Sequence, residues 1–119
     1  MPYFENKGDY LLMTPSGEYS LQSYREALVS AAALCREYKL KRILADIRNV
    51  KINIPVPDRF LLGADMARIF GYRVKFAILA PSEIIDRVAE NAAVNRGGRV
   101  FVTDDLQAAL KWLESEHLE

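Results

Sequence analysis

The chain has 119 residues, of which 50% are hydrophobic and 27% are charged, a composition typical of a globular domain that can bury a core without metal or disulfide support. Lysine and arginine number 16, and so do aspartate and glutamate, a balance that disfavours nucleic acid and other polyanions as partners. The single cysteine, Cys35, excludes an internal disulfide and a cysteine-based metal site.

Neither a secretory leader nor a membrane span is predicted. Residues 1–9 do not contain the basic segment followed by an apolar segment that is typical of a signal peptide. No apolar run approaches the roughly 20 residues that a transmembrane helix needs. We therefore expect a cytoplasmic protein in which residues 1–119 form one domain.

The first predicted element is a β-hairpin. Tyr3–Asn6 and Tyr10–Thr14 flank a turn in which Gly8 can take a positive φ at little cost. A break at residues 15–17 follows, and Glu18–Ser20 is expected to continue the sheet.

Helices and strands are predicted to alternate along the rest of the chain. Apolar residues recur at three- and four-residue steps after Ser20, which we expect to be the N-cap of the first helix. The expected helices cover residues 21–38, 57–70, 81–96 and 104–113. The expected core strands cover residues 42–47, 74–80 and 99–103. This alternation indicates βαβ units, and hence an α/β fold with a mixed, mostly parallel sheet of about five strands, an N-terminal hairpin and four helices.

Three acidic residues follow the predicted strands. Asp46, Asp104 and Asp105 stand at the carboxyl ends, where ligands of such sheets usually bind. They could hold Mg²⁺ as in a phosphoacceptor receiver domain, but the first strand ends in Met13-Thr14-Pro15, without the acidic pair of a receiver. We favour roles at helix N-termini and at a strand end. An acid-assisted enzyme stays as an alternative that requires the three carboxylates to converge.

Other residues that could carry chemistry have simpler interpretations. Ser82 could be a nucleophile or a phosphorylation site, but the only histidine, His117, lies in the terminal tail, so Ser82 is expected to be an N-cap. Cys35 lies in the apolar stripe of the first helix and is expected to act as a small hydrophobic residue. Asn95–Arg99 joins a helix to a strand, which favours a glycine C-cap over a phosphate cradle. We therefore expect no catalytic residue, metal or cofactor.

The second predicted helix carries more apolar surface than one sheet-facing stripe requires. The surplus must contact the preceding segment, residues 50–57, a second subunit or partner protein, or an apolar ligand. The predicted interaction surface consists of Ile52, Ile54, Val56, Phe60, Leu61, Leu62, Met66, Ile69 and Phe70.

Four stretches of the sequence carry a family resemblance. They are Gly17-Glu18-Tyr19-Ser20, Lys41–Asp46, Val74–Ala80, and Arg99–Asp104 followed by Ala109-Leu110-Lys111-Trp112-Leu113. In this order they resemble the SpoIIAA-like family, whose fold is shared with STAS domains such as anti-sigma-factor antagonists. The resemblance runs from about residue 9 to residue 113 and implies the SpoIIAA-like fold.

The resemblance does not extend to the phosphorylation switch of the antagonists. Antagonist STAS domains place a phosphorylatable serine at the start of the helix after the second core strand. This chain has Ile54-Pro55-Val56-Pro57-Asp58 there, with neither serine nor threonine. SpoIIAA-like proteins are also compared with lipid-binding CRAL-TRIO domains, which suits the apolar second helix.

The sequence thus predicts a non-enzymatic protein-interaction or regulatory module. We expect it to self-associate as a homodimer, or to dock a regulatory protein partner, through residues 57–70 and the segment before them. The alternative is a carrier of a small apolar, lipid-like ligand.

Overall fold

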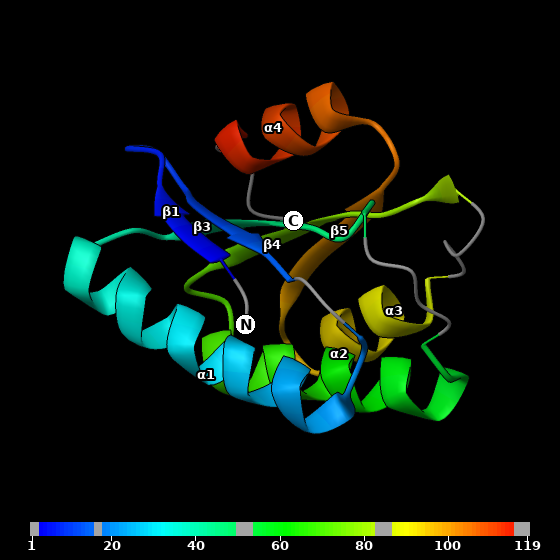
Figure 1. Ribbon diagram of the computed structural model, residues 1–119. Helices are drawn as coiled ribbons and strands as arrows, with labels where there is room; N and C mark the ends of the chain where they lie inside the picture. Colours follow the sequence, from blue (N-terminus) through cyan, green and yellow to red (C-terminus); the bar gives the residue numbers. More distant parts are fainter. Residues whose placement is uncertain (1–2, 16–17, 50–53, 83–86, 116–119) are drawn as a thin grey trace.

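A five-stranded sheet forms the middle layer of the computed structural model, which describes residues 3–15, 18–49, 54–82 and 87–115 (Figure 1). Its strands are β1 (Tyr3–Asn6), β2 (Leu11–Thr14), β3 (Arg42–Asp46), β4 (Lys75–Leu79) and β5 (Arg99–Thr103). They lie side by side in chain order. β1 pairs antiparallel with β2, and the other three pairings are parallel. The predicted mixed sheet with an N-terminal hairpin is confirmed, and Gly8 in the hairpin turn has a φ of +93°.

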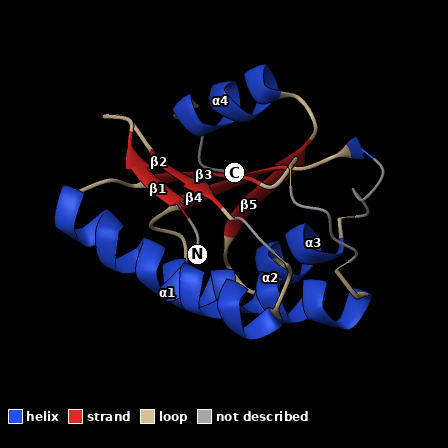
Figure 2. Ribbon diagram, viewed as in Figure 1, coloured by secondary structure: helices blue, strands red, loops and turns tan. Residues whose placement is uncertain are grey.

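Four helices cover the two faces of this sheet. They are α1 (Leu21–Tyr38), α2 (Val56–Phe70), α3 (Val88–Val94) and α4 (Leu106–Glu114). Figure 2 shows α1, α2 and α3 packed below the sheet and α4 alone above it. None of the helices in the described ranges combines the length and the hydropathy of a membrane span.

Each face of the sheet has its own hydrophobic core. On β4, Phe76 and Ile78 belong to the larger core beneath α1, α2 and α3, while Ala77 and Leu79 belong to the smaller core beneath α4. This follows from the two-residue period of side chains along a strand. Because both faces are covered, β4 is apolar at almost every position and lacks an alternating pattern.

The start of α1 confirms one prediction and corrects another. Ser20 is the N-cap, and its Oγ accepts a hydrogen bond from the Ser23 N–H at 3.0 Å. The prediction that Glu18–Ser20 forms a strand is wrong. Ser20 has extended dihedral angles because an N-cap residue adopts them, and the segment pairs with no strand.

The described part of α3 is shorter than predicted. The helix begins at Val88, and its N-cap position is taken by Arg87, which has a φ of +66°. The expectation that Ser82 caps this helix is therefore wrong. Residues 83–86 of the predicted helix lie outside the described residues.

Two basic side chains from the sheet hold the end of α4. Lys75 on β4 is only 6% exposed, and its Nζ donates hydrogen bonds to the carbonyl oxygens of Trp112 and, at 2.8 Å, of Ser115. Arg42 on β3 donates from Nε to the Leu113 carbonyl at 2.6 Å. Carbonyls at a helix C-terminus have no partner within the helix and carry partial negative charge, so cations stabilise them.

Candidate functional site

α2 packs against three neighbours, which accounts for most of its apolar surface. On one side, a Cβ built on Gly63 would lie 2.3 Å from the Ala89 carbonyl oxygen of α3, so only glycine permits this approach. Toward the sheet, Phe70 contacts Phe76 of β4 with ring centroids 5.4 Å apart. On the side of α1, Asp65 is bound by Arg25.

The predicted interaction surface divides into a buried and an exposed part. Four of its residues are buried inside the described structure, namely Ile54, Leu62, Met66 and Phe70, and Ile69 is half-buried. Val56, Phe60 and Leu61 are exposed by 53%, 43% and 37%. Ile52 lies outside the described residues. A partner could therefore reach Val56, Phe60 and Leu61, which we call the α2 patch, and its role stays a prediction.

Charged side chains of the first turn of α2 and of the segment after α3 lie near the α2 patch. The Arg96 guanidinium lies 4.6 Å from the centroid of the Phe60 ring, within the range of a cation–π contact. The Arg59 Nε donates to the Ile54 carbonyl oxygen at 2.8 Å, which ties the first turn of α2 to the chain before it. The Asp58 carboxylate, next to Arg59 in the sequence, accepts a hydrogen bond from Tyr19. The patch is thus a small apolar area with one arginine, Arg96, against it.

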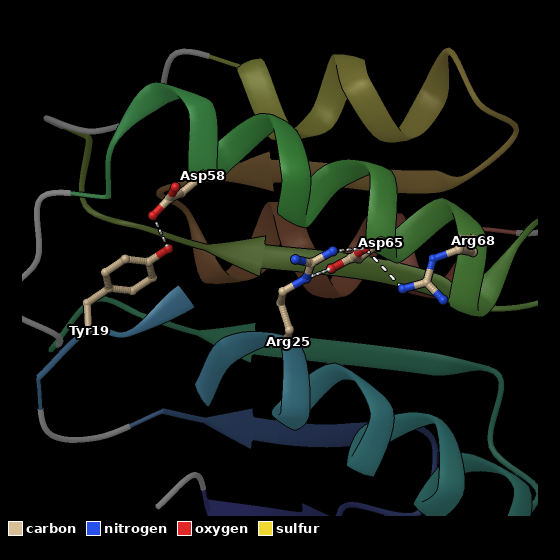
Figure 3. A network of polar contacts seen from close by, with 5 residues as sticks. All are labelled: Tyr19, Arg25, Asp58, Asp65 and Arg68. Atoms are coloured by element: carbon tan, nitrogen blue, oxygen red, sulfur yellow. Dashed lines mark hydrogen bonds and ion pairs between the residues drawn. The ribbon is translucent and has the colours of Figure 1, made fainter. Parts of the chain in front are cut away.

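Polar contacts hold α2 at two points, one to Tyr19 just before α1 and one to α1 itself (Figure 3). At the first, the Tyr19 hydroxyl donates to the Asp58 Oδ2 at 2.8 Å. At the second, Arg25 donates to both carboxylate oxygens of Asp65, at 2.6 and 3.1 Å, and Arg68 donates to Oδ1 at 3.0 Å. These contacts set the position of the helix that carries the patch.

The Asp65 carboxylate stays ionised although it is 4% exposed. Burial by itself would raise its pKa, but the hydrogen bonds from Arg25 and Arg68 outweigh burial and hold the pKa below its usual value. Tyr19 shows the opposite case: burial and the hydrogen bond to Asp58 both raise its pKa, so its hydroxyl acts as a donor.

A cavity of about 90 Å³ lies between the sheet and the helices at the carboxyl ends of the parallel strands. The strands contribute Met13, Ala45, Ile78 and Val102 to its wall. This is the side on which open α/β sheets usually bind ligands. The wall is almost entirely apolar.

The helices close the other side of this cavity. α1 contributes Tyr24 and Leu28, and α2 contributes Arg59, Leu62 and Met66. The apolar face of α2 that the sequence assigns to a partner or a ligand therefore partly faces this cavity.

The Tyr24 hydroxyl has an unusual environment. Its oxygen is buried and has no hydrogen-bond partner within the described ranges. Its ring meets the Tyr19 ring edge-on, with centroids 4.9 Å apart. Burial raises the pKa of Tyr24 to about 12, so the group is a neutral donor at physiological pH. Nothing in the sequence pointed to this unpaired hydroxyl, because helical periodicity does not report hydrogen-bond partners.

The acidic residues at the strand ends have local roles. Asp46 accepts hydrogen bonds from the Arg48 Nε and Nη2 at 3.0 and 2.9 Å, and these bonds lower its pKa despite partial burial. Asp105 is the N-cap of α4, as predicted, and accepts from the Gln107 N–H at 3.0 Å. Asp104 is exposed. In the part of the chain that the structure describes, no three His, Cys, Asp or Glu side chains form a group that could hold a metal ion.

The cysteine and the glycine-rich segment occupy the environments expected for them. Cys35 is buried in α1, and burial raises the pKa of its thiol to about 11. Gly97 follows α3 with a φ of +90°, and the Gly98 N–H donates to the Ala93 carbonyl at 2.8 Å. His117 lies outside the described residues.

The solved structures that are similar to this one include the following two. An anti-sigma factor antagonist from Mycobacterium paratuberculosis superposes with a TM-score of 0.67 at 15% sequence identity, over 97% of this chain and 94% of that one. An uncharacterized protein of the DUF3478 family with a SpoIIAA-like fold, from Shewanella loihica PV-4, superposes with a TM-score of 0.55 at 20% identity, over 95% and 92%. No protein-family model and no curated protein sequence matches the chain. At these identities the likeness shows the fold alone, and this chain has the SpoIIAA-like fold that its sequence resemblance implies.

Proposed function

We propose that the protein is a non-enzymatic regulatory protein-interaction module that binds through the α2 patch. The observation that carries this proposal is the exposure of Val56, Phe60 and Leu61 on a helix whose other faces are buried. The likeness to an anti-sigma factor antagonist, a regulatory protein by name, supports it. The carboxylates of Asp46 and Asp105 are each hydrogen-bonded to a residue two positions further along the chain. These hydrogen bonds give both carboxylates a structural role, which favours a binding protein over an acid-assisted enzyme.

A second copy of the chain is the partner that the patch suits best. Val56, Phe60 and Leu61 are exposed apolar side chains close together on one helix. A twofold axis through such a patch would bring the apolar groups of two copies together. The net charge of zero adds no general repulsion between copies.

Sedimentation velocity over a concentration series tests this assignment. The protein should dimerise, and Phe60→Asp should raise the dissociation constant at least about tenfold, because large buried side chains at the centre of an interface dominate binding. Met66 is unsuitable for the same substitution because it is buried, and a charge there would unfold the protein.

Val29→Asp is the matched control, because Val29 is an exposed apolar residue on α1, outside the patch. Its dissociation constant should equal that of the unsubstituted protein. A monomer at several hundred micromolar, or equal effects of the two substitutions, would contradict self-association through α2.

The cavity favours a second candidate function, the carriage of a small apolar ligand. Its apolar wall and its place at the carboxyl ends of the strands support this proposal. Native mass spectrometry of freshly purified protein should show an adduct of low mass that disappears on unfolding. Finding only the unliganded mass under conditions that retain a known weak ligand would contradict a tightly held cargo.

A further inference from the structure

The cations of the chain are distributed unevenly, although its net charge is zero. The parallel strands β2 to β5 all begin at one edge of the sheet, which we call the amino edge, and α1 and α4 end on that side of the molecule (Figure 1). With the exception of Arg96, the basic residues that are exposed and form no ion pair within the described ranges gather there. They are Arg36, Lys39, Lys41, Arg73 and Lys111.

The other exposed cations of the described residues are occupied. Each of five pairs with a carboxylate, namely Lys7, Arg25, Arg48, Arg68 and Arg87. Arg96 lies against the Phe60 ring and donates to the Ala92 carbonyl oxygen at 3.1 Å. Positive charge that is not neutralised by a neighbour therefore faces solvent mainly at the amino edge. Such a local field attracts ligands of opposite charge even when the whole protein is neutral.

Three of these cations lie on neighbouring segments of the chain. Lys41 precedes β3, and its carbonyl oxygen accepts a hydrogen bond from the Lys75 N–H of β4 at 2.9 Å. Arg73 comes two residues before Lys75, so its backbone runs beside that of Lys41. Lys39 lies between the end of α1 and Lys41. We call Lys39, Lys41 and Arg73 the amino-edge cations.

Lys39 adopts a backbone conformation that favours glycine. Its φ is +59°, in the left-handed region, at the position after α1 where helices often have glycine. A residue with a side chain is strained in this conformation, and strained residues of this kind cluster at functional sites. A positive charge therefore occupies a position at which glycine would be more stable.

Two exposed tyrosines lie next to the amino-edge cations in the chain. Tyr38 ends α1 and is 42% exposed, and Tyr72 precedes Arg73 and is 45% exposed. The Arg99 guanidinium lies over the Tyr72 ring, 4.7 Å from its centroid. Tyrosine hydroxyl, ammonium and guanidinium groups all donate hydrogen bonds. Carboxylates accept such bonds, and the bonds are stronger when donor or acceptor is charged.

The charges at this edge suit a short acidic segment better than a nucleic acid. Glu37 is exposed beside Tyr38, and Asp9 before β2 and Glu114 at the end of α4 are exposed as well. Together with the net charge of zero, these carboxylates oppose the long row of phosphates in a nucleic acid. A protein segment with a few carboxylates needs to contact only the amino-edge cations.

We propose that the amino edge binds an acidic segment of a partner protein, whose carboxylates contact Lys39, Lys41 and Arg73. The α2 patch lies in the first turns of α2, whereas Arg73 follows the end of that helix. Because the 15 residues of α2 span about 22 Å, the two surfaces are separate. The inference therefore does not depend on dimerisation through the α2 patch.

Fluorescence anisotropy with a matched pair of labelled peptides tests the proposal. The acidic peptide is four repeats of Glu-Gly, and the neutral peptide is four repeats of Gln-Gly, which has nearly the same shape. The full chain is used, because residues 116–119, outside the described residues, include two further glutamates. The acidic peptide should bind at least about tenfold more tightly than the neutral one, and its affinity should fall as salt is added.

Two variants assign this binding to the amino edge. The double substitution Lys41→Gln with Arg73→Gln should weaken the acidic peptide at least about tenfold. Lys39→Gly should also weaken it, while the melting temperature stays unchanged or rises because glycine relieves the strained φ.

A second double substitution is the matched control for net charge. Arg48→Gln with Arg87→Gln removes the same number of charges from ion pairs that lie away from the amino edge, and it should leave the affinity for the acidic peptide nearly unchanged. Equal losses in the two double variants would show that net charge, and not the amino edge, controls binding. Equal binding of the two peptides would overturn the charge assignment.

Two further measurements separate this proposal from its alternatives. A twelve-residue oligothymidylate that binds more tightly than the acidic peptide would replace the protein segment by a single-stranded nucleic acid and overturn the partner proposed here. Phe60→Asp should keep the full affinity for the acidic peptide, because Phe60 belongs to the α2 patch. Loss of peptide binding in a folded Phe60→Asp variant would contradict the independence of the two surfaces.

Discussion

Arg25 of α1 donates two hydrogen bonds to Asp65 of α2, from Nε at 2.6 Å and from Nη2 at 3.1 Å (Figure 3). Arg68 also binds this carboxylate, which is buried, whereas the guanidinium groups of both arginines reach solvent. Removing an arginine therefore leaves a buried charge with one partner fewer. Removing the carboxylate leaves only cations that water can solvate.

This geometry predicts unequal effects of the two arginines. Arg25→Met should lower the free energy of unfolding more than Arg68→Met, because Arg25 supplies two hydrogen bonds and joins two helices. Arg68 supplies one hydrogen bond from within α2 itself. Urea denaturation of both variants measures the difference. Equal losses would show that the link between α1 and α2 adds nothing beyond local charge pairing.

Acid should act on the same carboxylate. The pKa of Asp65 is lowered in the folded state, so its ionised form stabilises the fold at pH values above the unfolded pKa of about 3.9. This contribution is lost as the pH falls through the lower, folded pKa, because the unfolded chain binds the proton first. The unfolding free energy should therefore fall as the pH is lowered through the unfolded pKa toward the lower, folded pKa, and it should fall less in Asp65→Asn.

Asp46→Asn is the comparison for this pH profile. The pKa of Asp46 is also lowered, through Arg48, but this pair is more exposed, and solvent screens it. Its removal should flatten the profile less than Asp65→Asn does. Identical profiles for Asp65→Asn and the unsubstituted protein would contradict the stabilising role of the buried pair.

The order of helices and strands could be predicted from the sequence because each element carries its own periodic or capping signal. The surplus apolar surface of α2 could also be recognised, but the sequence did not show which parts of the protein cover it. Leu62, Met66 and Phe70 are covered within the described structure because α2 packs against the sheet as well as against α1 and α3, and these are contacts between distant parts of the chain. The burial of Asp65 could not be predicted for the same reason, since its partner Arg25 is 40 residues away in the sequence.

The cavity and the lysine under α4 left still weaker signals in the sequence. A cavity forms where side chains from several helices and strands leave space unfilled between them. No local sequence pattern reports such a gap. Lys75 interrupts an apolar strand, and that interruption was a usable sign of a buried cation with partners. The missing information was that the strand passes under the C-terminus of α4.

Gly63→Ala should destabilise the protein although alanine is the better helix former. Helix propensity alone predicts a gain of about 0.8–1.0 kcal/mol in unfolding free energy. The new Cβ would lie 2.3 Å from the Ala89 carbonyl oxygen, so α2 and α3 must separate, at a cost of about 1–3 kcal/mol. The expected result is a net loss, measured by urea denaturation.

Ala33→Gly, at an exposed position of α1, calibrates the propensity effect in this protein. If Gly63→Ala gains the free energy that Ala33→Gly loses, the close approach of α2 to α3 exerts no strain and the packing argument fails.

Lys75→Met should loosen the end of α4. Methionine keeps most of the side-chain volume but leaves the carbonyl oxygens of Trp112 and Ser115 without the donor that Lys75 provides, which should cost about 1–3 kcal/mol. Lys111→Met is the control, because Lys111 lies exposed in the last turn of the same helix and its loss should change stability by less than about 0.5 kcal/mol. Hydrogen exchange should show faster opening of amides in α4 for Lys75→Met alone. Because α4 is the sole described cover of its sheet face, equal exchange in the two variants would mean that packing of Leu113, and not the buried lysine, holds the helix in place.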